Sequence, residues 1–312
     1  MRALKMCCCT VTPKISFEFF PPKTILGSDH LWQTIDRLAT LNPQFLSVTY
    51  GAGGSTRKKT RDTVARIHRR TGLSVAAHLT CVGASRSEVM AVANSYLEAG
   101  VRHIVALRGD PPAGAGTRFT PHPKGFSNAA DLVAGLKRVA DFEISVAAHP
   151  EVHPDASSAQ ADLDNIRAKV DAGADRLITQ YFFGVDAFLR FRDRVRAGGI
   201  EVPLVPGIMP ICNFGVLRRF SKACGATIPA WLKECFDNLD NDPEIRQLVA
   251  AAVATEQCKQ LQAEGVDAFH FYTLNRAPLA LAVCRRLGIR PACDSPAVPV
   301  GSANAGQGRA QA

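Results

Sequence analysis

The sequence predicts an α/β fold, a (β/α)8 TIM barrel with extra helices before the last strand. Three observations predict it. Short apolar runs alternate with longer stretches of helical period, which is the pattern of repeated βα units around a parallel sheet. Eight such units fit within residues 14–290, close to the usual size of this barrel. Polar residues follow the apolar runs, at the positions where barrel enzymes carry their catalytic groups.

The expected strands are the short apolar runs themselves. They cover approximately residues 15–20, 44–50, 74–80, 102–108, 143–149, 175–182, 202–208 and 268–274. A helical stripe with the spacing i, i+3, i+4, i+7, i+8 is formed by Val89, Val92, Ala93, Tyr96 and Leu97. Residues 163–170 show a shorter stripe, and residues 225–265 are expected to add helices inside the last unit. A doubly wound sheet is the alternative, but the sequence contains neither GxGxxG nor GxxxxGK(S/T).

We expect the barrel, residues 14–290, to be flanked by segments without fixed structure. Residues 1–13 are interpreted as a flexible N-terminus. Residues 291–312 are rich in Pro, Ala, Gly and Ser and have almost nothing to bury, so they predict a disordered tail. Residues 111–127 hold Gly114, Gly116 and several prolines, typical of a loop that could form a lid.

Composition limits the class of protein. Of the 312 residues 46% are apolar, which is enough for a sizeable core. Charged or turn residues interrupt every apolar run before the roughly 20 residues that a bilayer span needs. The N-terminus lacks the apolar segment of a signal peptide, so we expect a cytoplasmic protein without a membrane partner. The ten cysteines show no metal-ligand spacing, so no metal site is predicted, and Cys7–Cys9 is interpreted as an oxidation-prone terminus.

The net charge of +9 favours anionic partners. Its densest part is residues 57–70, a helix-like stretch rich in Arg and Lys. Few aromatic residues lie among these bases, which weakens an interpretation as a nucleic-acid surface. A solvated helix face is the simpler interpretation.

Glu18 is the most informative residue, because it lies inside the apolar segment Ile15–Phe20. Burial disfavours the charged form of a carboxyl group and raises its pKa, which is how a protein makes a general acid at neutral pH. A solvated strand face, or a bond to a nearby Arg, is the alternative.

Two further strand ends carry candidate binding groups. Arg108-Gly109-Asp110 places a cation, a residue without a side chain and an anion side by side, which suits a flat cofactor ring. His149 and His153 are four residues apart, but Pro150 and Pro154 argue against a metal-binding helix. Contacts to phosphate or ring atoms, or plain packing, are the alternatives for these imidazoles.

One helix face and one loop complete the candidates. Asp162, Asn165 and Lys169 share a helix face that could hold ribose hydroxyls and a pyrophosphate, although an ordinary solvated face is the alternative. The loop Gly51–Thr56 ends in N-cap residues and could donate to an anion.

Ordered strings along the chain resemble the 5,10-methylenetetrahydrofolate reductase family. The strings are Ser16–Pro22, Ser47–Ala52, His78–Cys81, His103–Asp110, Pro150–His153, Asp171–Ala174, Ile178–Gln180, Pro206–Ile208 and Phe269–Arg276. They cover roughly residues 14–291. The resemblance implies a flavoprotein on a (β/α)8 barrel, in which FAD is reduced by a nicotinamide nucleotide and the folate then receives hydride.

The resemblance also implies roles for individual residues. Glu18 would protonate N10 of the folate, and Asp110 would lie near flavin and pterin and tune their charge. FAD-contacting positions match Thr49, Tyr50, Ala52, His78, Arg108, Gly109, Asp110, His149, His153, Asp162, Asn165 and Lys169. Folate-contacting positions match Glu18, Asp110, Gln180, Phe220 and Arg276. Gln180 and Phe220 would also face the nicotinamide nucleotide, which suits ping-pong turnover.

The sequence differs from the family pattern at several of these positions. His149 stands where the family often has Tyr, Ala168 lacks a basic side chain of some relatives, and Val216 replaces a polar residue. Residues 113–128 form a longer loop than in compact relatives. The chain length matches the barrel alone, so NADH is expected as donor rather than NADPH, and we expect a homo-oligomer with no nucleic-acid partner.

Two alternatives remain. One is a flavin-independent barrel that binds a pterin. The other is a basic protein that binds nucleic acid or another polyanion through residues 57–70.

Overall fold

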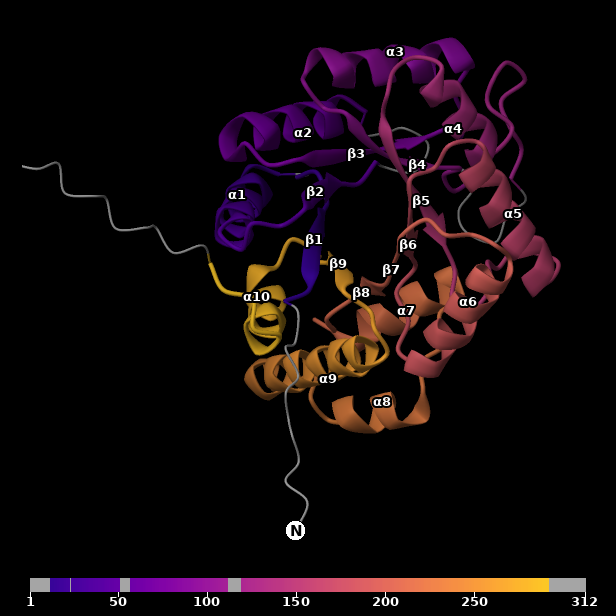
Figure 1. Cartoon of the computed structure of the whole chain (residues 1–312). Helices are drawn as coiled ribbons and strands as arrows, with labels where there is room; N and C mark the ends of the chain where they lie inside the picture. The colour runs from indigo at the N-terminus through magenta and orange to yellow at the C-terminus, as the bar shows by residue number, and fades with distance from the viewer. Residues whose placement is uncertain (1–11, 23, 51–56, 112–118, 292–312) are drawn as a thin grey trace, which may run out of the picture.

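Nine short parallel strands form one sheet in the residues that the computed structural model describes, 12–22, 24–50, 57–111 and 119–291. They are β1 (Lys14–Phe19), β2 (Phe45–Val48), β3 (Val75–Thr80), β4 (His103–Leu107), β5 (Glu143–Ala148), β6 (Arg176–Thr179), β7 (Leu204–Val205), β8 (Gly207–Ile208) and β9 (Ala268–Tyr272). Their order is β7-β6-β5-β4-β3-β2-β1-β9-β8. Only Pro206 separates β7 from β8, so the two edge strands are nearly continuous and the sheet closes into a barrel (Figure 1).

One predicted strand is divided. Residues 202–208 were expected as a single strand, but Pro206 splits it into β7 and β8. Proline has no N–H to donate, so it interrupts the ladder, while its carbonyl still accepts from the His270 amide at 3.0 Å. β7 pairs with β6 and β8 pairs with β9, so this split segment is the point of closure.

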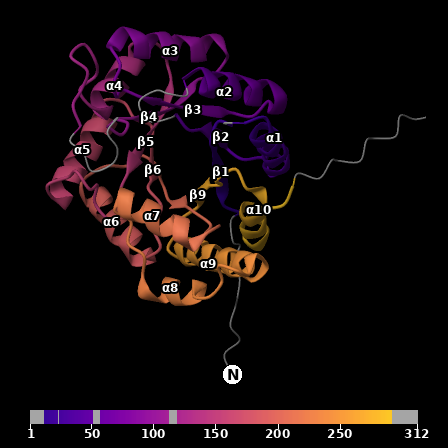
Figure 2. The same cartoon turned by 180° about the vertical axis from the view of Figure 1, so that it is seen from behind.

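Ten helices surround the strands in the described part of the chain (Figures 1 and 2). They are α1 (Ile25–Ala39), α2 (Arg57–Thr71), α3 (Arg86–Glu98), α4 (Ala129–Lys137), α5 (Ala159–Asp171), α6 (Val185–Ala197), α7 (Phe214–Cys224), α8 (Ala230–Phe236), α9 (Pro243–Ala263) and α10 (Ala277–Arg286). The (β/α)8 prediction is confirmed, and α8 and α9 are the helices expected within residues 225–265. No helix within the described ranges is both long and apolar enough to cross a membrane.

The predicted stripe at residues 89–97 lies in α3. A capping box between Ser85 and Glu88 begins this helix, and Val89, Ala93 and Tyr96 are buried against the core. Part of the predicted lid, residues 112–118, lies outside the described residues. Residues 119–127 contain neither helix nor strand.

Alternation along β1 and β9 separates an apolar face from a polar one. Phe17, Phe19 and Phe271 are buried in the core between the barrel and its helices. Successive side chains of a strand point to opposite faces, so Ser16 and Glu18 point into the barrel. Ser16 is paired in register with His270, which also points inward. The apolar neighbours of Glu18 therefore pack away from its carboxylate, and the strand is two-faced rather than uniformly apolar.

Candidate functional site

Two adjoining cavities open at the carboxyl ends of the strands. The first, of about 540 Å³, is lined by residues that include Glu18, Thr49, Tyr50, His78, Arg108, Asp110, His149, His153, Gln180 and Phe220. The second, of about 600 Å³, shares several of these residues and adds Gly109, Asp162, Asn165 and Lys169. The structure thus brings together almost all of the predicted site residues. Arg276 lines a smaller neighbouring cavity with Phe220, and Ala52 lies outside the described residues.

Glu18 lies between two imidazoles inside the barrel mouth. Its Oε2 is 3.2 Å from Nε2 of His78 and 3.5 Å from Nε2 of His270, and its side chain is 12% exposed. Burial raises the pKa of this carboxyl group, but the charges and contacts of the two imidazoles together lower it to about 2. The pKa of Glu18 is therefore lowered, and not raised as burial alone would make it. Burial of the strand is visible in the sequence, whereas the convergence of two histidines from β3 and β9 on Glu18 is not.

The loop after β9 fixes the backbone from the Glu18 carbonyl to Phe20. Thr273 donates its hydroxyl to the Glu18 carbonyl at 2.6 Å. The Asn275 side chain accepts from the Phe20 amide at 2.9 Å and donates to the Phe20 carbonyl at 3.0 Å. Leu274 and Asn275 have φ values of 49° and 58°, a left-handed turn that brings the Asn275 amide to β1.

Arg108-Gly109-Asp110 follows β4 at the boundary of the two cavities. Arg108 pairs with Asp155 at 2.7 Å and stacks on Phe119, and Asp110 is exposed at the rim. Gly109 has φ 84°, and a Cβ there would lie 2.5 Å from the Val82 side chain. The backbone conformation and the Val82 side chain in the turn after β3 therefore require glycine, independently of any ligand.

The second cavity contains a buried polar group on α5. Lys169 and Asp162 are buried, whereas Asn165 is exposed, so the alternative of an ordinary solvated face is wrong for the first two. Lys169 donates to the Ala147 carbonyl at 2.8 Å. Burial lowers the pKa of Lys169 to about 8, with Asp162 opposing this shift. A buried ammonium with a lowered pKa favours an incoming anion.

The two loop histidines lie edge to face, with ring centroids 4.5 Å apart. Burial, followed by the charge of the neighbouring His153, lowers the pKa of His149 to about 3. Burial also lowers the pKa of His153, whose Nδ1 accepts from the Asp155 amide at 3.0 Å. His149 is therefore a neutral ring at the cavity wall. Among the described residues, no group of His, Cys, Asp and Glu is arranged to hold a metal ion.

The remaining predicted residues lie around the mouth. The Gln180 side chain accepts from the Tyr181 amide at 3.0 Å, and the Thr49 carbonyl accepts from Thr60 at 3.0 Å. Phe220 is 48% exposed on α7 and presents an apolar ring to solvent at the cavity edge. Such a ring is free to cover a flat ligand.

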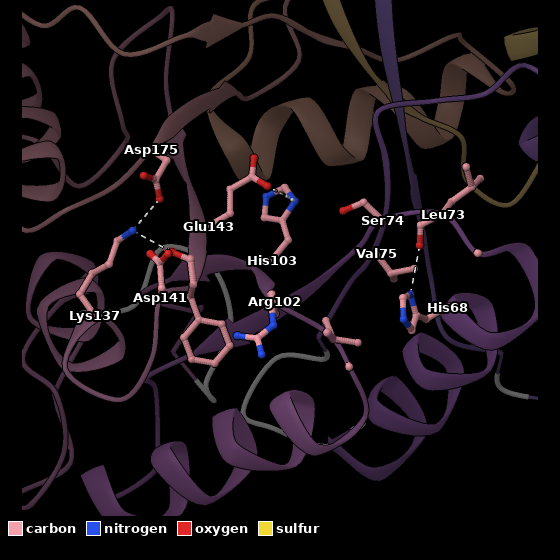
Figure 3. Close-up of a pocket in the computed structure, with 14 residues that line it drawn as sticks. His68, Leu73, Ser74, Val75, Arg102, His103, Lys137, Asp141, Glu143 and Asp175 are labelled. Carbon is pink, nitrogen blue, oxygen red and sulfur yellow. Dashed lines mark hydrogen bonds and ion pairs between the residues drawn. The ribbon is translucent and has the colours of Figure 1, made fainter.

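A separate cavity of about 510 Å³ lies at the amino ends of β3, β4 and β5 (Figure 3). Its polar groups contact one another: Lys137 pairs with Asp175 at 2.8 Å, and His103 faces Glu143 at 3.8 Å. No predicted site residue lines it. In this barrel type the amino-terminal face contributes to stability, so we assign no chemistry to this cavity.

The basic stretch of residues 57–70 forms most of α2. The Arg66 guanidinium lies 4.1 Å from the ring centre of Trp32, and Arg70 pairs with Asp36 at 2.6 Å. Arg66 and Arg70 are therefore engaged within the chain, which weakens the interpretation of this helix as a polyanion-binding surface.

Sequence reasoning missed His270 and Ser16 as site residues. Both lie within strings that were used for the family resemblance, but neither ends a strand. Only the register of β1 against β9 reveals that they face each other inside the barrel. Strand alternation puts Ser16 on the same face as Glu18, and this was the one signal in the sequence that could have identified Ser16.

The chain matches one protein family along the whole length of its barrel. The family model for methylenetetrahydrofolate reductase matches residues 5–288. The 5,10-methylenetetrahydrofolate reductases of Pectobacterium carotovorum and Escherichia coli are 53% and 52% identical to the chain over 277 residues, covering 89% of it and 91% of each relative. Methylenetetrahydrofolate reductase (NADH) 1 of Arabidopsis thaliana is 38% identical, covering 88% of the chain and 48% of that protein.

A solved structure supports the fold alone. An uncharacterized protein from Clostridium thermocellum that binds two copies of 5-methyl-5,6,7,8-tetrahydrofolic acid superposes with a TM-score of 0.58 at 15% identity, covering 88% of this chain and 94% of that one. The family model and the curated relatives carry the assignment. With 52–53% identity over nearly its full barrel, the chain belongs to the methylenetetrahydrofolate reductase family.

Proposed function

We propose that the chain reduces 5,10-methylenetetrahydrofolate to 5-methyltetrahydrofolate, with FAD as bound cofactor and NAD(P)H, preferably NADH, as reductant. The observation that carries the proposal is the Glu18 carboxylate, held between two imidazoles at the wall of a cavity of about 540 Å³. Family membership supports a folate substrate, and we place it in that cavity. The placement of Glu18 gives the cavity an acid that can reach a bound ligand.

The residues of the two cavities fit FAD by their chemistry. Leu107 and Ile178 offer an apolar wall for a flat ring. Lys169 and Arg108 offer cations for the pyrophosphate, and Asp162 offers a carboxylate to ribose hydroxyls. The buried ammonium of Lys169, whose pKa burial lowers, is favoured by an anion at this position. When bound, FAD supplies the redox chemistry, accepting hydride from NAD(P)H and giving it to the folate.

Glu18 would donate a proton to N10 of the folate. Protonation makes N10 a leaving group, so the five-membered ring opens and the methylene carbon on N5 becomes electrophilic. General acids of this kind contribute roughly 10²–10⁴-fold to rate. Because the two imidazoles lower the pKa of Glu18 to about 2, Glu18 would have to gain its proton as the ligand covers the site.

The other mouth residues would bind and orient. Asp110, exposed at the rim of both cavities, would oppose negative charge on the ring system beside it and stabilise positive charge on the pterin. Gln180 and Phe220 would contact folate and nicotinamide in turn, and Arg276 would pair with a folate carboxylate. Since both substrates would use one face of the cavity, we expect ping-pong kinetics.

The test separates the two half-reactions in a Glu18→Gln variant. We expect NADH to reduce the variant's flavin at a rate near that of the wild type, while methylenetetrahydrofolate reoxidises it at least about a hundredfold more slowly. Purified protein that is colourless, and remains so after incubation with FAD, would contradict the proposal at its first step. Reoxidation at the wild-type rate would remove Glu18 from the role of acid.

A further inference from the structure

We propose that His270 is a positioning residue that acts through Glu18: one proton passes between Nε2 of His270 and Oε2 of Glu18, and this exchange supplies the proton that Glu18 donates. The inference rests on the proposed function, in which Glu18 is the acid. His270 is 1% exposed and lines neither mouth cavity, so it reaches the folate only through the carboxylate.

Ser16 determines which nitrogen of His270 exchanges the proton. Oγ of Ser16 is 2.7 Å from Nδ1 of His270 and donates to the Phe269 carbonyl at 3.5 Å. A hydroxyl that donates to this carbonyl accepts from Nδ1–H, so we assign a lasting proton to Nδ1. Nε2, which faces Oε2 of Glu18 at 3.5 Å, is then the nitrogen that gains and loses a proton.

The imidazole is held by packing on both sides. The Phe45 ring stacks on it with centroids 5.7 Å apart, and the Tyr272 ring meets it edge-on at 5.4 Å. Tyr272 donates its hydroxyl to the Thr179 carbonyl, and burial raises its pKa well above the usual value, so it remains neutral. These contacts keep Nε2 directed at Glu18 whether or not a ligand is present.

The other charged groups of the barrel interior do not compete for this proton. Burial, followed by the charge of Arg176, lowers the pKa of His103 to about 3, so His103 is neutral. Arg176 pairs with Glu143 at 2.7 Å at the far end of the barrel. Among the described residues, Glu18 is the one carboxylate within ion-pair distance of His270.

His78, the second neighbour of Glu18, differs in position. It lines the mouth cavity, so a bound ligand changes its surroundings. His270 lies on the interior side of the carboxylate, where a ligand does not reach. The two imidazoles therefore have different roles. His78 contacts Glu18 from the side of the cavity, and His270 exchanges a proton with Glu18 from the barrel interior.

The proton step is a simple transfer within the pair. With the proton on Nε2 the pair is charged; when the N–H bond at Nε2 breaks and an O–H bond forms at Oε2, a neutral acid faces a neutral imidazole. A ligand that covers the mouth excludes water, and exclusion of water penalises the charged pair more than the neutral one. Covering the site therefore moves the proton to Glu18, and solvent replaces it after product leaves.

The first test uses the apoprotein and needs no activity. In ¹⁵N-histidine spectra, with His270 assigned by its absence from His270→Gln, we expect Nδ1 to stay protonated across the pH titration while Nε2 exchanges. Glu18→Gln replaces the carboxylate oxygen that faces Nε2, so the Nε2 signal should shift while the Nδ1 signal stays in place. Titration at Nδ1, or an Nε2 signal identical in Glu18→Gln, would overturn the proposal.

The second test compares two interior histidines that each contact a serine. His103 lies 2.8 Å from Ser145 but has no contact with Glu18, so His103→Gln is the matched control for His270→Gln. In His270→Gln we expect flavin reduction by NADH within about twofold of the wild type, folate-driven reoxidation at least about tenfold slower, and a changed pH profile of that step. His103→Gln should leave both half-reactions and the profile unchanged.

The outcomes separate this proposal from the proposed function. Normal reoxidation in Glu18→Gln would refute the role of Glu18 itself. Slow reoxidation in Glu18→Gln with a normal rate and pH profile in His270→Gln would refute only the role of His270. If His270→Gln does not fold, the His270 signal is assigned instead by its shift in Ser16→Ala, which removes the hydroxyl beside Nδ1, and the ¹⁵N spectra of the wild type and Glu18→Gln then decide the question.

Discussion

Replacing Glu18 by Gln should change how the stability of the chain depends on pH. The folded-state pKa of Glu18 is lowered from 4.5 to about 2, because the two imidazoles outweigh burial. A group whose pKa is lowered on folding contributes stability above its unfolded-state pKa, and this contribution is lost as pH falls through the folded value. The window is therefore pH 4.5 to about 2.

The magnitude follows from the size of the shift. At about 1.4 kcal/mol per pKa unit, the whole difference corresponds to about 3 kcal/mol, which is an upper bound for a coupled buried group. Roughly 2 kcal/mol of it should be lost by pH 3. Gln cannot ionise, so the variant lacks this contribution to the free energy of unfolding at every pH.

Urea unfolding followed by circular dichroism measures the effect. The unfolding free energies of the wild type and Glu18→Gln should converge as pH falls from 5 to 3, relative to their difference at pH 6. Glu201→Gln, which removes an exposed carboxylate, controls for a general loss of charge. A difference between wild type and Glu18→Gln that stays constant from pH 6 to 3 would refute the assignment of Glu18 as an ion-paired carboxylate.

Two further substitutions test the walls of the site. Gly109→Ala should destabilise the chain by about 1–3 kcal/mol, because its φ is 84° and the new Cβ would lie 2.5 Å from the Val82 side chain. Adding Val82→Ala should recover part of that loss in urea unfolding, and no loss in the single variant would contradict the steric reason. Lys169→Met should weaken FAD binding to the apoprotein at least about tenfold in a flavin fluorescence titration, whereas Lys169→Arg keeps the charge and should retain more affinity. Equal affinities in all three chains would exclude Lys169 from the pyrophosphate site.

The architecture could be predicted from the sequence because the apolar runs, the helical stripes and the positions of the polar residues all indicated the same fold. Alternating apolar runs and helical stripes predicted the strands and helices, and the end of each run marked where polar residues would gather. The split at Pro206 was the exception. A proline inside a short apolar run interrupts the ladder, and that local effect is visible in the sequence only once strand pairing is considered.

The residues of the candidate site could be predicted from the sequence, but the pKa of Glu18 could not. Glu18 lies near the end of β1, and Asp110 and Gln180 follow β4 and β6; the carboxyl ends of these strands meet at one face, so topology alone assembles the three residues. The pKa of Glu18 depends on two histidines that are 60 and 252 residues away along the chain, and on side-chain orientation within the barrel. The register between β1 and β9 places His270 beside β1, the order of β1, β2 and β3 places His78 on the other side, and periodicity encodes neither.

The most direct test of the central claim is the oxidation of reduced, FAD-loaded enzyme by methylenetetrahydrofolate under anaerobic conditions, in the wild type and in Glu18→Gln. We predict rapid recovery of flavin absorbance with formation of 5-methyltetrahydrofolate in the wild type, and loss of that recovery in the variant while its reduction by NADH persists. Equal recovery in both chains, or none in the wild type, would contradict the account.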